Sequence, residues 1–384
     1  MIYLDNAATS FPKPVEVYDR MNLFIRKECA NPGRSSHEMA RTSATWVMKT
    51  REAVASLFGI DNPLRIGFTA NATYALNMAI QGVLKKGDHV ITTAMDHNSV
   101  LRPLCELKKQ GIIDYTIIMP YNSYGSIDPF AVSKALRPNT RLIVLTASSN
   151  VTGTILPYEE VGEIARKKGI IYLVDAAQGA GVLPLDVKIM NISMIAFPGH
   201  KGLMGPQGTG GLYVNENVSL SPIIQGGTGS HSFETFQPLF MPDIIECGTL
   251  NTPGIVGLGT GVEFILKTGT NSILKRKEIL LGKLYEGLAA YKRIKLYSTA
   301  ENHKNSGIIA FNIDGMDSSE TANLLDSRYN IATRPGFHCA PLAHKALGTE
   351  KTGMVRLSLG YFNTPDEIRY TIDSIKEIAG IRKP

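Results

Sequence analysis

The chain has 384 residues, of which 43% are hydrophobic and 19% are charged, a composition typical of folded globular proteins that excludes disordered and collagen-like classes. The formal net charge is +6, but Lys and Arg are dispersed along the chain, which argues against a nucleic-acid partner. The four cysteines are scattered and form no CxxC pair, so we expect neither a disulfide framework nor a metal site.

The N-terminal sequence MIYLDNAATSFPKP contains neither a basic region nor an apolar run, so we expect no signal peptide. No apolar run in the chain is long enough to span a bilayer, so we expect no membrane partner. Together with the sparse cysteines, these features predict a cytoplasmic protein.

Short apolar, β-branched runs alternate with helical patterns between about residues 60 and 215. The runs predict strands at 65–69, 88–93, 115–119, 141–146, 170–174, 192–197 and 209–214. Helices are predicted at 36–58, 72–84, 98–110 and 157–168. This alternation indicates βαβ units and therefore an α/β fold around a seven-stranded, mostly parallel, doubly wound sheet.

The C-terminal third has a different pattern. It predicts a long helix at 274–292, a strand at 307–313, and helices near 317–327 and 365–379. We therefore expect a large domain over 1–255 and a smaller α+β domain over 256–384. The run GLGTGV at 257–262 lacks the full dinucleotide-binding pattern, and we expect a turn leading into a helix there.

Polar residues follow five of the predicted strands, at the sheet edge where open α/β sheets bind ligands. These groups are Asn71–Thr73, Asp96–Asn98, Ser149–Asn150, Asp175–Gln178 and Pro198–Lys201. A lysine is usually a solvated surface residue. Lys201, however, follows an apolar strand among glycines that allow close approach of a ligand, so it is a candidate for Schiff-base formation with a carbonyl group.

Asp175 has two interpretations that the local sequence does not separate. Its spacing to Gln178 is that of a capping pair at a helix start. Alternatively, an acid upstream of an activated lysine suits pyridoxal phosphate, because a carboxylate keeps the pyridine nitrogen protonated. Asn71 or Thr73 can cap the following helix, whose N-terminus also suits a phosphate. His97 is either a satisfied polar residue or a ring that stacks on the cofactor and moves protons.

Seven motifs in this order resemble those of cysteine desulfurases with the class V aminotransferase fold, particularly the branch that includes selenocysteine lyases. The motifs are YLDNAAT, NPGRSSH at 31–37, DHNSV, SSNVTGT at 148–154, DAAQ, FPGHKG and PGFHCAP at 335–341, and the likeness extends from Tyr3 to about Asn363. The resemblance implies a pyridoxal-phosphate transferase of fold type I that forms a homodimer.

The resemblance also implies residue roles. Lys201 would hold pyridoxal phosphate covalently, with Asp175 on the ring nitrogen, Gln178 near the ring hydroxyl and His97 stacked on the ring. The phosphate would be bound by Ala72, Thr73, His200 and, across the dimer, Thr249. The substrate would be bound by Asn150, Arg356 and, across the dimer, Arg34. Pro198 departs from the family, since many relatives carry a phosphate-binding serine there, and Phe337 stands where some relatives have a second histidine.

The role of Cys339 distinguishes a desulfurase from enzymes of this fold that catalyse other reactions. A lone cysteine is more often a small buried hydrophobe than a nucleophile, and we keep that interpretation for Cys29, Cys105 and Cys247. Cys339 instead lies in a predicted loop beside Gly336 and His338. The resemblance makes it the nucleophile that accepts sulfur as a persulfide.

The expected activity is therefore conversion of L-cysteine to L-alanine with transfer of sulfur to Cys339. The alternatives are a selenocysteine lyase acting on L-selenocysteine, a class V aminotransferase, and a non-catalytic protein that binds sulfur or pyridoxal phosphate. The segment between Cys339 and Arg356 is short. Because relatives with a short cysteine loop are usually slow alone, a dedicated sulfur-acceptor protein is a further expected partner.

Overall fold

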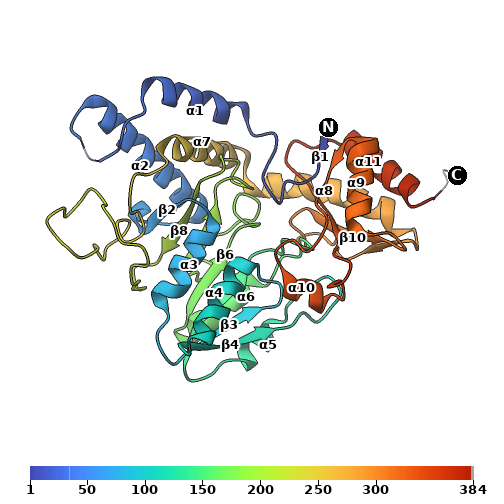
Figure 1. Ribbon diagram of the computed structural model, residues 1–384, viewed down its shortest axis with the longest axis horizontal. Coiled ribbons are helices and arrows are strands. Elements are labelled where there is room, and N and C mark those ends of the chain that lie inside the picture. Colours follow the sequence, from blue (N-terminus) through green and yellow to red (C-terminus); the bar gives the residue numbers. More distant parts are fainter. Residues whose placement is uncertain (34, 382–384) are drawn as a thin grey trace.

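A seven-stranded sheet forms the centre of the larger part of the molecule (Figure 1). The computed structural model describes residues 1–33 and 35–381. In sheet order, the strands are β2 (Ile66–Thr69), β8 (Gly210–Val214), β7 (Met194–Pro198), β6 (Ile171–Asp175), β5 (Thr140–Thr146), β3 (Asp88–Thr93) and β4 (Ile113–Ile118). Only β8 runs antiparallel to its neighbours. The predicted seven-stranded, mostly parallel sheet is confirmed.

Helices cover both faces of this sheet, which explains why strands such as β6 and β7 are buried along their whole length. One face packs against α3 (Ala72–Val83) and α4 (Asn98–Lys109). The other face packs against α2 (Glu38–Phe58), α6 (Tyr158–Lys168) and α7 (Thr252–Thr268). The remaining helices of this part are α1 (Val15–Lys27), the short α5 (Pro129–Lys134) and the 3-10 helix η1 (Pro63–Arg65).

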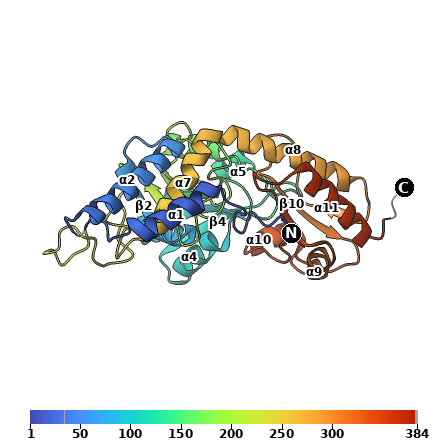
Figure 2. The ribbon, with the colours of Figure 1, turned by 90° about the horizontal axis from the view of Figure 1, so that it is seen from above.

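The smaller part contains an antiparallel sheet with its own apolar core. Its strands are, in sheet order, β12 (Val355–Ser358), β10 (Ile308–Ile313) and β9 (Ile294–Leu296). Its helices are α8 (Thr270–Ala289), which extends between the two parts in Figure 2, α9 (Ser318–Tyr329), α10 (Pro341–Ala346) and α11 (Pro365–Ile378). The predicted elements of this region are present, although α8 begins four residues before the predicted helix.

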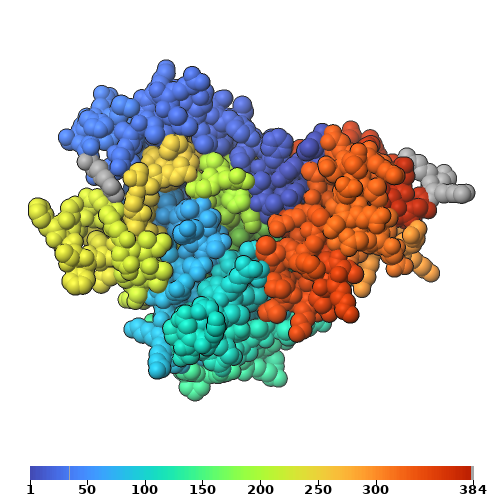
Figure 3. Space-filling view, viewed as in Figure 1, coloured from blue at the N-terminus to red at the C-terminus, as the bar shows by residue number. Residues whose placement is uncertain are grey.

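The N-terminal segment connects the two parts. β1 (Ile2–Tyr3) pairs in parallel with β11 (Ile331–Ala332) of the smaller part. The chain then crosses to α1 of the larger part, so its first residues lie where the two parts meet (Figure 3).

The prediction of a turn at 257–262 is wrong, because this run lies inside α7. Its glycines allow close packing rather than a break in the helix. A Cβ added at Gly259 would lie 2.3 Å from Thr50 Oγ1, and one at Gly261 would lie 2.4 Å from the Leu203 carbonyl oxygen. The boundary expected after residue 255 also falls within α7.

A buried ion pair fixes the loop that precedes α7. The two terminal guanidinium nitrogens of Arg51, Nη1 and Nη2, donate to the Glu246 carboxylate at 2.9 and 3.0 Å. The side chains of Arg51 and Glu246 are only 5% and 10% exposed. Glu246 Oε1 also accepts a hydrogen bond from the Phe68 amide at 2.7 Å. The pair therefore ties the loop to α2 and to β2.

Glu246→Ala is expected to lower the free energy of unfolding by about 3–5 kcal/mol, because it leaves a buried guanidinium without its counter-charge. Urea unfolding measures the change. The matched control is Asp61→Ala, which removes the acid of the exposed pair with Lys188 and should have no measurable effect. Equal stability of the Glu246 variant and the wild type would contradict this role.

Candidate functional site

The polar groups that follow the parallel strands meet at one edge of the large sheet. His97, Asn150 and Asp175 follow or end β3, β5 and β6, which are neighbours in the sheet. Lys201 follows β7, the next strand along. The carboxyl ends of parallel strands face the same way, so the fold itself brings these side chains together.

Lys201 and Asp175 influence each other electrostatically. Asp175 is buried at the end of β6, and burial raises the pKa of its carboxyl group, whereas the Ala177 amide and the Lys201 amine lower it. Burial lowers the pKa of the Lys201 amine to about 8, against the opposing effect of Asp175. Lys201 is therefore partly uncharged near neutral pH and can act as a nucleophile or a base.

Asp175 does not cap a helix. Its Oδ1 accepts a hydrogen bond from the Ala177 amide at 2.9 Å, and the residues that follow form turns rather than a helix. Gln178 instead donates from Nε2 to the Ala7 carbonyl oxygen at 3.0 Å, which ties this turn to the N-terminal segment. The first interpretation of Asp175, a cap at a helix start, is therefore wrong, and the second stays a prediction.

His97 is the N-cap of α4, and its ring is uncharged. Nδ1 accepts a hydrogen bond from the Ser99 amide at 3.1 Å, so the proton of the neutral ring is on Nε2. Burial, followed by the charges of Lys201 and Arg334, lowers the pKa of His97 to about 4. At neutral pH, this ring can stack on a flat ligand without carrying charge.

Two features suit an anionic group. Asn71 caps α3 by accepting from the Tyr74 amide at 3.1 Å, so Ala72 and Thr73 form the first turn at the positive end of the helix. A Cβ at Gly210 would lie 2.9 Å from the Asn71 backbone, so only glycine lets β8 approach this turn so closely. His200, after β7, has a buried Nδ1 atom without a hydrogen-bond partner among the described residues.

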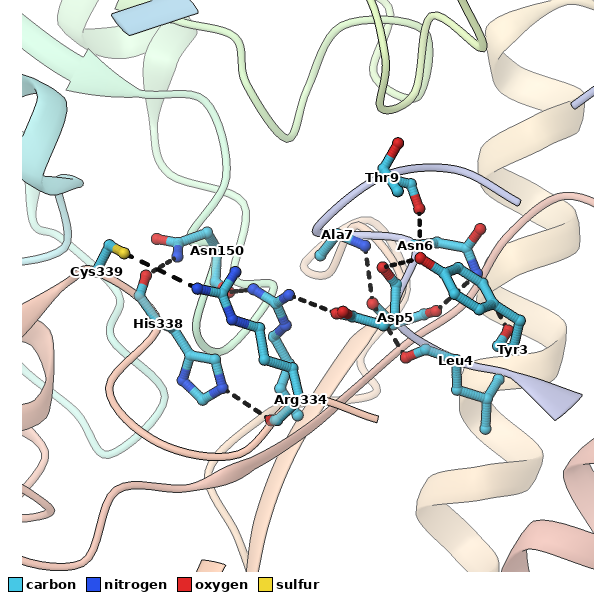
Figure 4. A network of polar contacts seen from close by, with 12 residues as sticks. Tyr3, Leu4, Asp5, Asn6, Ala7, Thr9, Asn150, Arg334, His338 and Cys339 are labelled. Atoms are coloured by element: carbon cyan, nitrogen blue, oxygen red, sulfur yellow. Dashed lines mark hydrogen bonds and ion pairs between the residues drawn. The ribbon is translucent and has the colours of Figure 1, made fainter. Parts of the chain in front are cut away.

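A buried guanidinium links three segments of the chain (Figure 4). Arg356, on β12, is 1% exposed; its Nη2 contacts Asp5 Oδ1 at 2.8 Å, and its Nη1 donates to the Asn150 carbonyl oxygen at 2.8 Å. Asn150 in turn donates from Nδ2 to the His338 carbonyl oxygen at 2.6 Å. The Nε atom of Arg356 is buried and has no partner within the described parts of the chain.

Cys339 lies at the tip of a strained turn. The Ala340 amide donates to the Phe337 carbonyl oxygen at 3.0 Å, and the two residues between them, His338 and Cys339, have φ values of 51° and 56°. Such left-handed conformations cost roughly 1–3 kcal/mol each for residues other than glycine and persist only where the surroundings impose them. The Asn98 amide contributes by donating to the Cys339 carbonyl oxygen at 2.9 Å.

The thiol of Cys339 is exposed, and its Sγ lies 3.9 Å from Nη2 of Arg334. Figure 4 draws this contact as a dashed line. Cys339 lines an open groove together with His97 and Thr73. Lys201 and Gln178 line a second cavity, beside the N-terminal segment. Cys339 therefore lies beside His97, whose pKa the Lys201 amine lowers, while Lys201 itself lines a separate cavity.

Two further site residues were expected to act across a dimer. Thr249 is exposed on the loop before α7, three residues after Glu246 of the buried ion pair with Arg51. Arg34 lies outside the described residues.

The burial expected for the other cysteines is wrong. Cys105 is exposed, because it lies on the solvent face of the amphipathic helix α4, and Cys29 and Cys247 are only partly buried. Exposure alone therefore does not distinguish Cys339 from Cys105.

Sequence reasoning missed the contacts that surround the predicted residues. Arg334 directly precedes the cysteine motif, five positions before Cys339, and no sequence pattern distinguishes it from other basic residues. Asp96 was noted at a strand end without a role. It is fully buried, and its Oδ2 accepts hydrogen bonds from the Thr92 and Thr93 hydroxyl groups and the Thr93 amide. Burial raises the pKa of Asp96 to about 6, and nearby Asp175 acts in the same direction.

Two kinds of feature are absent from the described residues. The described residues contain no group of three or more His, Cys, Asp or Glu side chains arranged to hold a metal ion. Every helix in the described part of the chain is too short or too polar to cross a lipid bilayer.

The family model of the class-V aminotransferases matches residues 2–370. The chain belongs to the class-V aminotransferase family. Within it, the chain is 34% identical to a probable cysteine desulfurase of Methanothermobacter thermautotrophicus, an alignment that covers 99% of this chain and 95% of the relative. The cysteine desulfurase IscS of Methanosarcina thermophila is 30% identical, with 98% of this chain and 91% of the relative covered.

Solved structures of class-V relatives have the same fold. The apo structure of a cysteine desulfurase from Thermococcus onnurineus matches with a TM-score of 0.92 and 31% identity, covering 99% of this chain and 94% of that chain. The cysteine desulfurase CsdA from Escherichia coli matches with a TM-score of 0.88 and 28% identity, covering 98% and 94%. The expected family and fold type are confirmed.

Asp5→Ala is expected to loosen the N-terminal segment of this class-V enzyme. Losing a hydrogen bond to a charged group costs about 2 kcal/mol, so the amide of Ala7, which donates to Ser358 Oγ, should exchange with solvent roughly thirtyfold faster. Amide hydrogen exchange measures this rate, with the amide of Val174 in β6 as the unaffected control. An unchanged rate at Ala7 would show that Arg356 does not hold the segment.

Proposed function

We propose that this protein is a pyridoxal-phosphate-dependent cysteine desulfurase, which converts L-cysteine to L-alanine and transfers the sulfur to Cys339. The observation that carries the proposal is the exposed thiol of Cys339, held on a strained turn beside His97. Lys201, an amine of lowered pKa, is close enough to His97 to lower the pKa of that ring. Relatives named cysteine desulfurase, matching along nearly the whole chain, support the same activity.

The residues present fit pyridoxal phosphate. Lys201 would bind its aldehyde carbon, Asp175 its ring nitrogen and Gln178 its ring hydroxyl, while the uncharged ring of His97 would stack on it. The phosphate would be held by the first turn of α3, at Ala72 and Thr73, and by the unpartnered Nδ1 of His200. When bound, this cofactor withdraws electrons from the substrate carbon, which weakens the bond between Cβ and sulfur.

The phosphate site departs from many relatives at one position. Pro198 offers neither a hydroxyl group nor a backbone N–H group to the phosphate. The backbone donors at the start of α3 and the ring of His200 are the groups that compensate.

Lys201 is the proton carrier of the proposed reaction. With substrate and cofactor bound, Nζ of Lys201 would remove the proton from the substrate α-carbon and would later return a proton. A pKa of about 8 suits an amine that must do both near neutral pH. The lowered pKa of His97 leaves that ring neutral, so it assists by stacking and through its Nε2 proton.

The sulfur step needs no external oxidant. The Cys339 thiolate attacks the substrate sulfur, so an S–S bond forms and the bond between Cβ and sulfur breaks. The electron pair of the broken bond remains with the substrate, which takes up a proton and leaves as alanine. Nη2 of Arg334, 3.9 Å from Sγ, places a positively charged group beside the protein sulfur.

The substrate carboxylate is assigned to Arg356 and Asn150. The buried, unpartnered Nε of Arg356 provides a free donor, although Asn150 Nδ2 is engaged with the His338 carbonyl oxygen. We assign the cofactor to the larger part, residues 1–255, and the nucleophile to residues 256–384. A homodimer in which Thr249 and Arg34 complete the neighbouring site, and a sulfur-acceptor protein, belong to the same proposal.

Cys339→Ala should lose cysteine-dependent alanine formation almost completely while it retains the yellow cofactor, because only the sulfur acceptor is removed. Alanine is quantified after L-cysteine is added to the purified protein. Cys105→Ser is the matched control, since Cys105 is also exposed, and it should keep full activity. Retained turnover of L-selenocysteine in the Cys339 variant, with little turnover of L-cysteine in the wild type, would identify a lyase instead.

Uptake of pyridoxal phosphate by the apo protein should accelerate about tenfold per pH unit below pH 8 and then level off. The reason is that only the neutral amine of Lys201 attacks an aldehyde, and the pKa of this amine is lowered to about 8. Stopped-flow absorbance measures the rate. Burial also lowers the pKa values of Lys13 and Lys277 to about 8, so Lys201→Ala, which should form no chromophore, identifies the reacting lysine. A half-rise near the ordinary value of 10.5 would contradict the assignment.

A further inference from the structure

Two histidines that have no role in the proposed chemistry form a buried chain beneath Cys339. His338, His344 and Thr349 are only 3%, 0% and 1% exposed. His338 Nδ1 lies 3.4 Å from His344 Nε2, and the two rings stack with their centroids 5.5 Å apart. His344 Nδ1 lies 2.9 Å from Thr349 Oγ1, and the far end of the chain is His338 Nε2, 3.0 Å from the Arg334 carbonyl oxygen.

The contacts between the rings favour one arrangement of protons, while the Thr349 hydroxyl also lies 3.4 Å from the His344 carbonyl oxygen. The Arg334 carbonyl oxygen can only accept, so His338 carries its proton on Nε2 and its Nδ1 is an acceptor. His344 therefore donates from Nε2, and its own Nδ1 accepts the hydroxyl proton of Thr349. Burial lowers the pKa of His338 to about 3 and that of His344 to about 4, so both rings are neutral.

This chain ends at the strained turn. His338 is the first of the two left-handed residues, and its ring is held at both nitrogens, while its carbonyl oxygen accepts from Asn150 Nδ2. The ring of Phe337 packs edge-on against His344, which closes the other side. The conformation of His338, and with it the position of the Cys339 thiol, is thus fixed from the side chain as well as from the backbone.

We propose that His344 and Thr349 are positioning residues for sulfur transfer, which act through the ring of His338 to hold the turn that presents Cys339. This inference rests on the proposed desulfurase activity. Neither residue contacts the groove that contains the thiol, so neither is a catalytic residue. Their hydrogen bonds are the only side-chain partners of His338 Nδ1 and His344 Nδ1 in the described residues.

His344→Leu should lower kcat for alanine formation roughly 10- to 100-fold, because a misplaced nucleophile loses reactivity steeply with distance. The cofactor absorbance should remain unchanged, because the cofactor contacts other residues. KM for L-cysteine should change far less than kcat, because the turn contacts the proposed substrate site through the hydrogen bond of Asn150 to the His338 carbonyl oxygen. His344→Gln should restore most of kcat, since its amide can still donate to His338 Nδ1. An unchanged kcat in the leucine variant, or parallel loss of KM, cofactor and kcat without rescue by glutamine, overturns the proposal.

Thr349→Val and Thr349→Ser form a second pair of variants, in which the change of side-chain volume is smaller. Valine keeps the volume but removes the hydroxyl donor, whereas serine keeps the donor. We expect a lower kcat for valine and a nearly normal kcat for serine, at equal melting temperatures. Equal kcat values for the two variants would overturn the role of Thr349, even if the leucine variant at position 344 fails to fold.

Amide exchange in the cofactor-free protein provides a readout that is independent of activity. The Ala340 amide closes the turn, and the Asn98 amide donates to the Cys339 carbonyl oxygen. Both should exchange about tenfold faster in Thr349→Val than in Thr349→Ser, corresponding to a loss of about 1.4 kcal/mol, while Val174 is unaffected. If these rates are equal, the inference fails. If they differ but the wild type forms no alanine, the proposed function fails and the positioning of the turn stands.

Discussion

The buried guanidinium of Arg356 is the contact on which the site depends. It lies on a strand of the smaller part, pairs with Asp5 of the N-terminal segment and donates to the Asn150 carbonyl oxygen of the large sheet. A charge so fully buried is stable only while these partners remain in place. This side chain therefore joins the two parts of the molecule beside the loop that carries Cys339, together with the hydrogen bond from Asn150 to His338.

Around this contact, burial sets the protonation states that the chemistry needs. It raises the pKa of Asp175 and lowers the pKa values of Lys201 and His97. Each shift disfavours the charged form, yet Asp175 and Lys201 restore part of the charge on each other. As a result, the Lys201 amine has a pKa close to neutral pH, and the ring of His97 is neutral. These are the protonation states that the proposed cofactor chemistry needs.

The large sheet was predictable because strands covered on both faces appear as continuous apolar runs, as in β6 and β7. Lys201, Asp175 and His97 were predictable because parallel strands deliver their ends to one edge. The glycines of α7 were misread, since glycine favours turns in isolation but here serves close packing. The pairing of Asp5 with Arg356 was inaccessible, because its partners lie 351 positions apart and no periodicity links them.

The left-handed turn at His338 and Cys339 exists only where the rest of the fold holds it. An isolated octapeptide with the sequence RPGFHCAP would lose the histidine chain, the asparagine contacts and the neighbouring guanidinium of β12, and its backbone would relax to extended forms. Its thiol would then no longer be held in a fixed position by the turn. The capacity to capture sulfur is thus a property of the folded enzyme rather than of the motif, so a match to this motif alone, outside this fold, is not evidence for the activity.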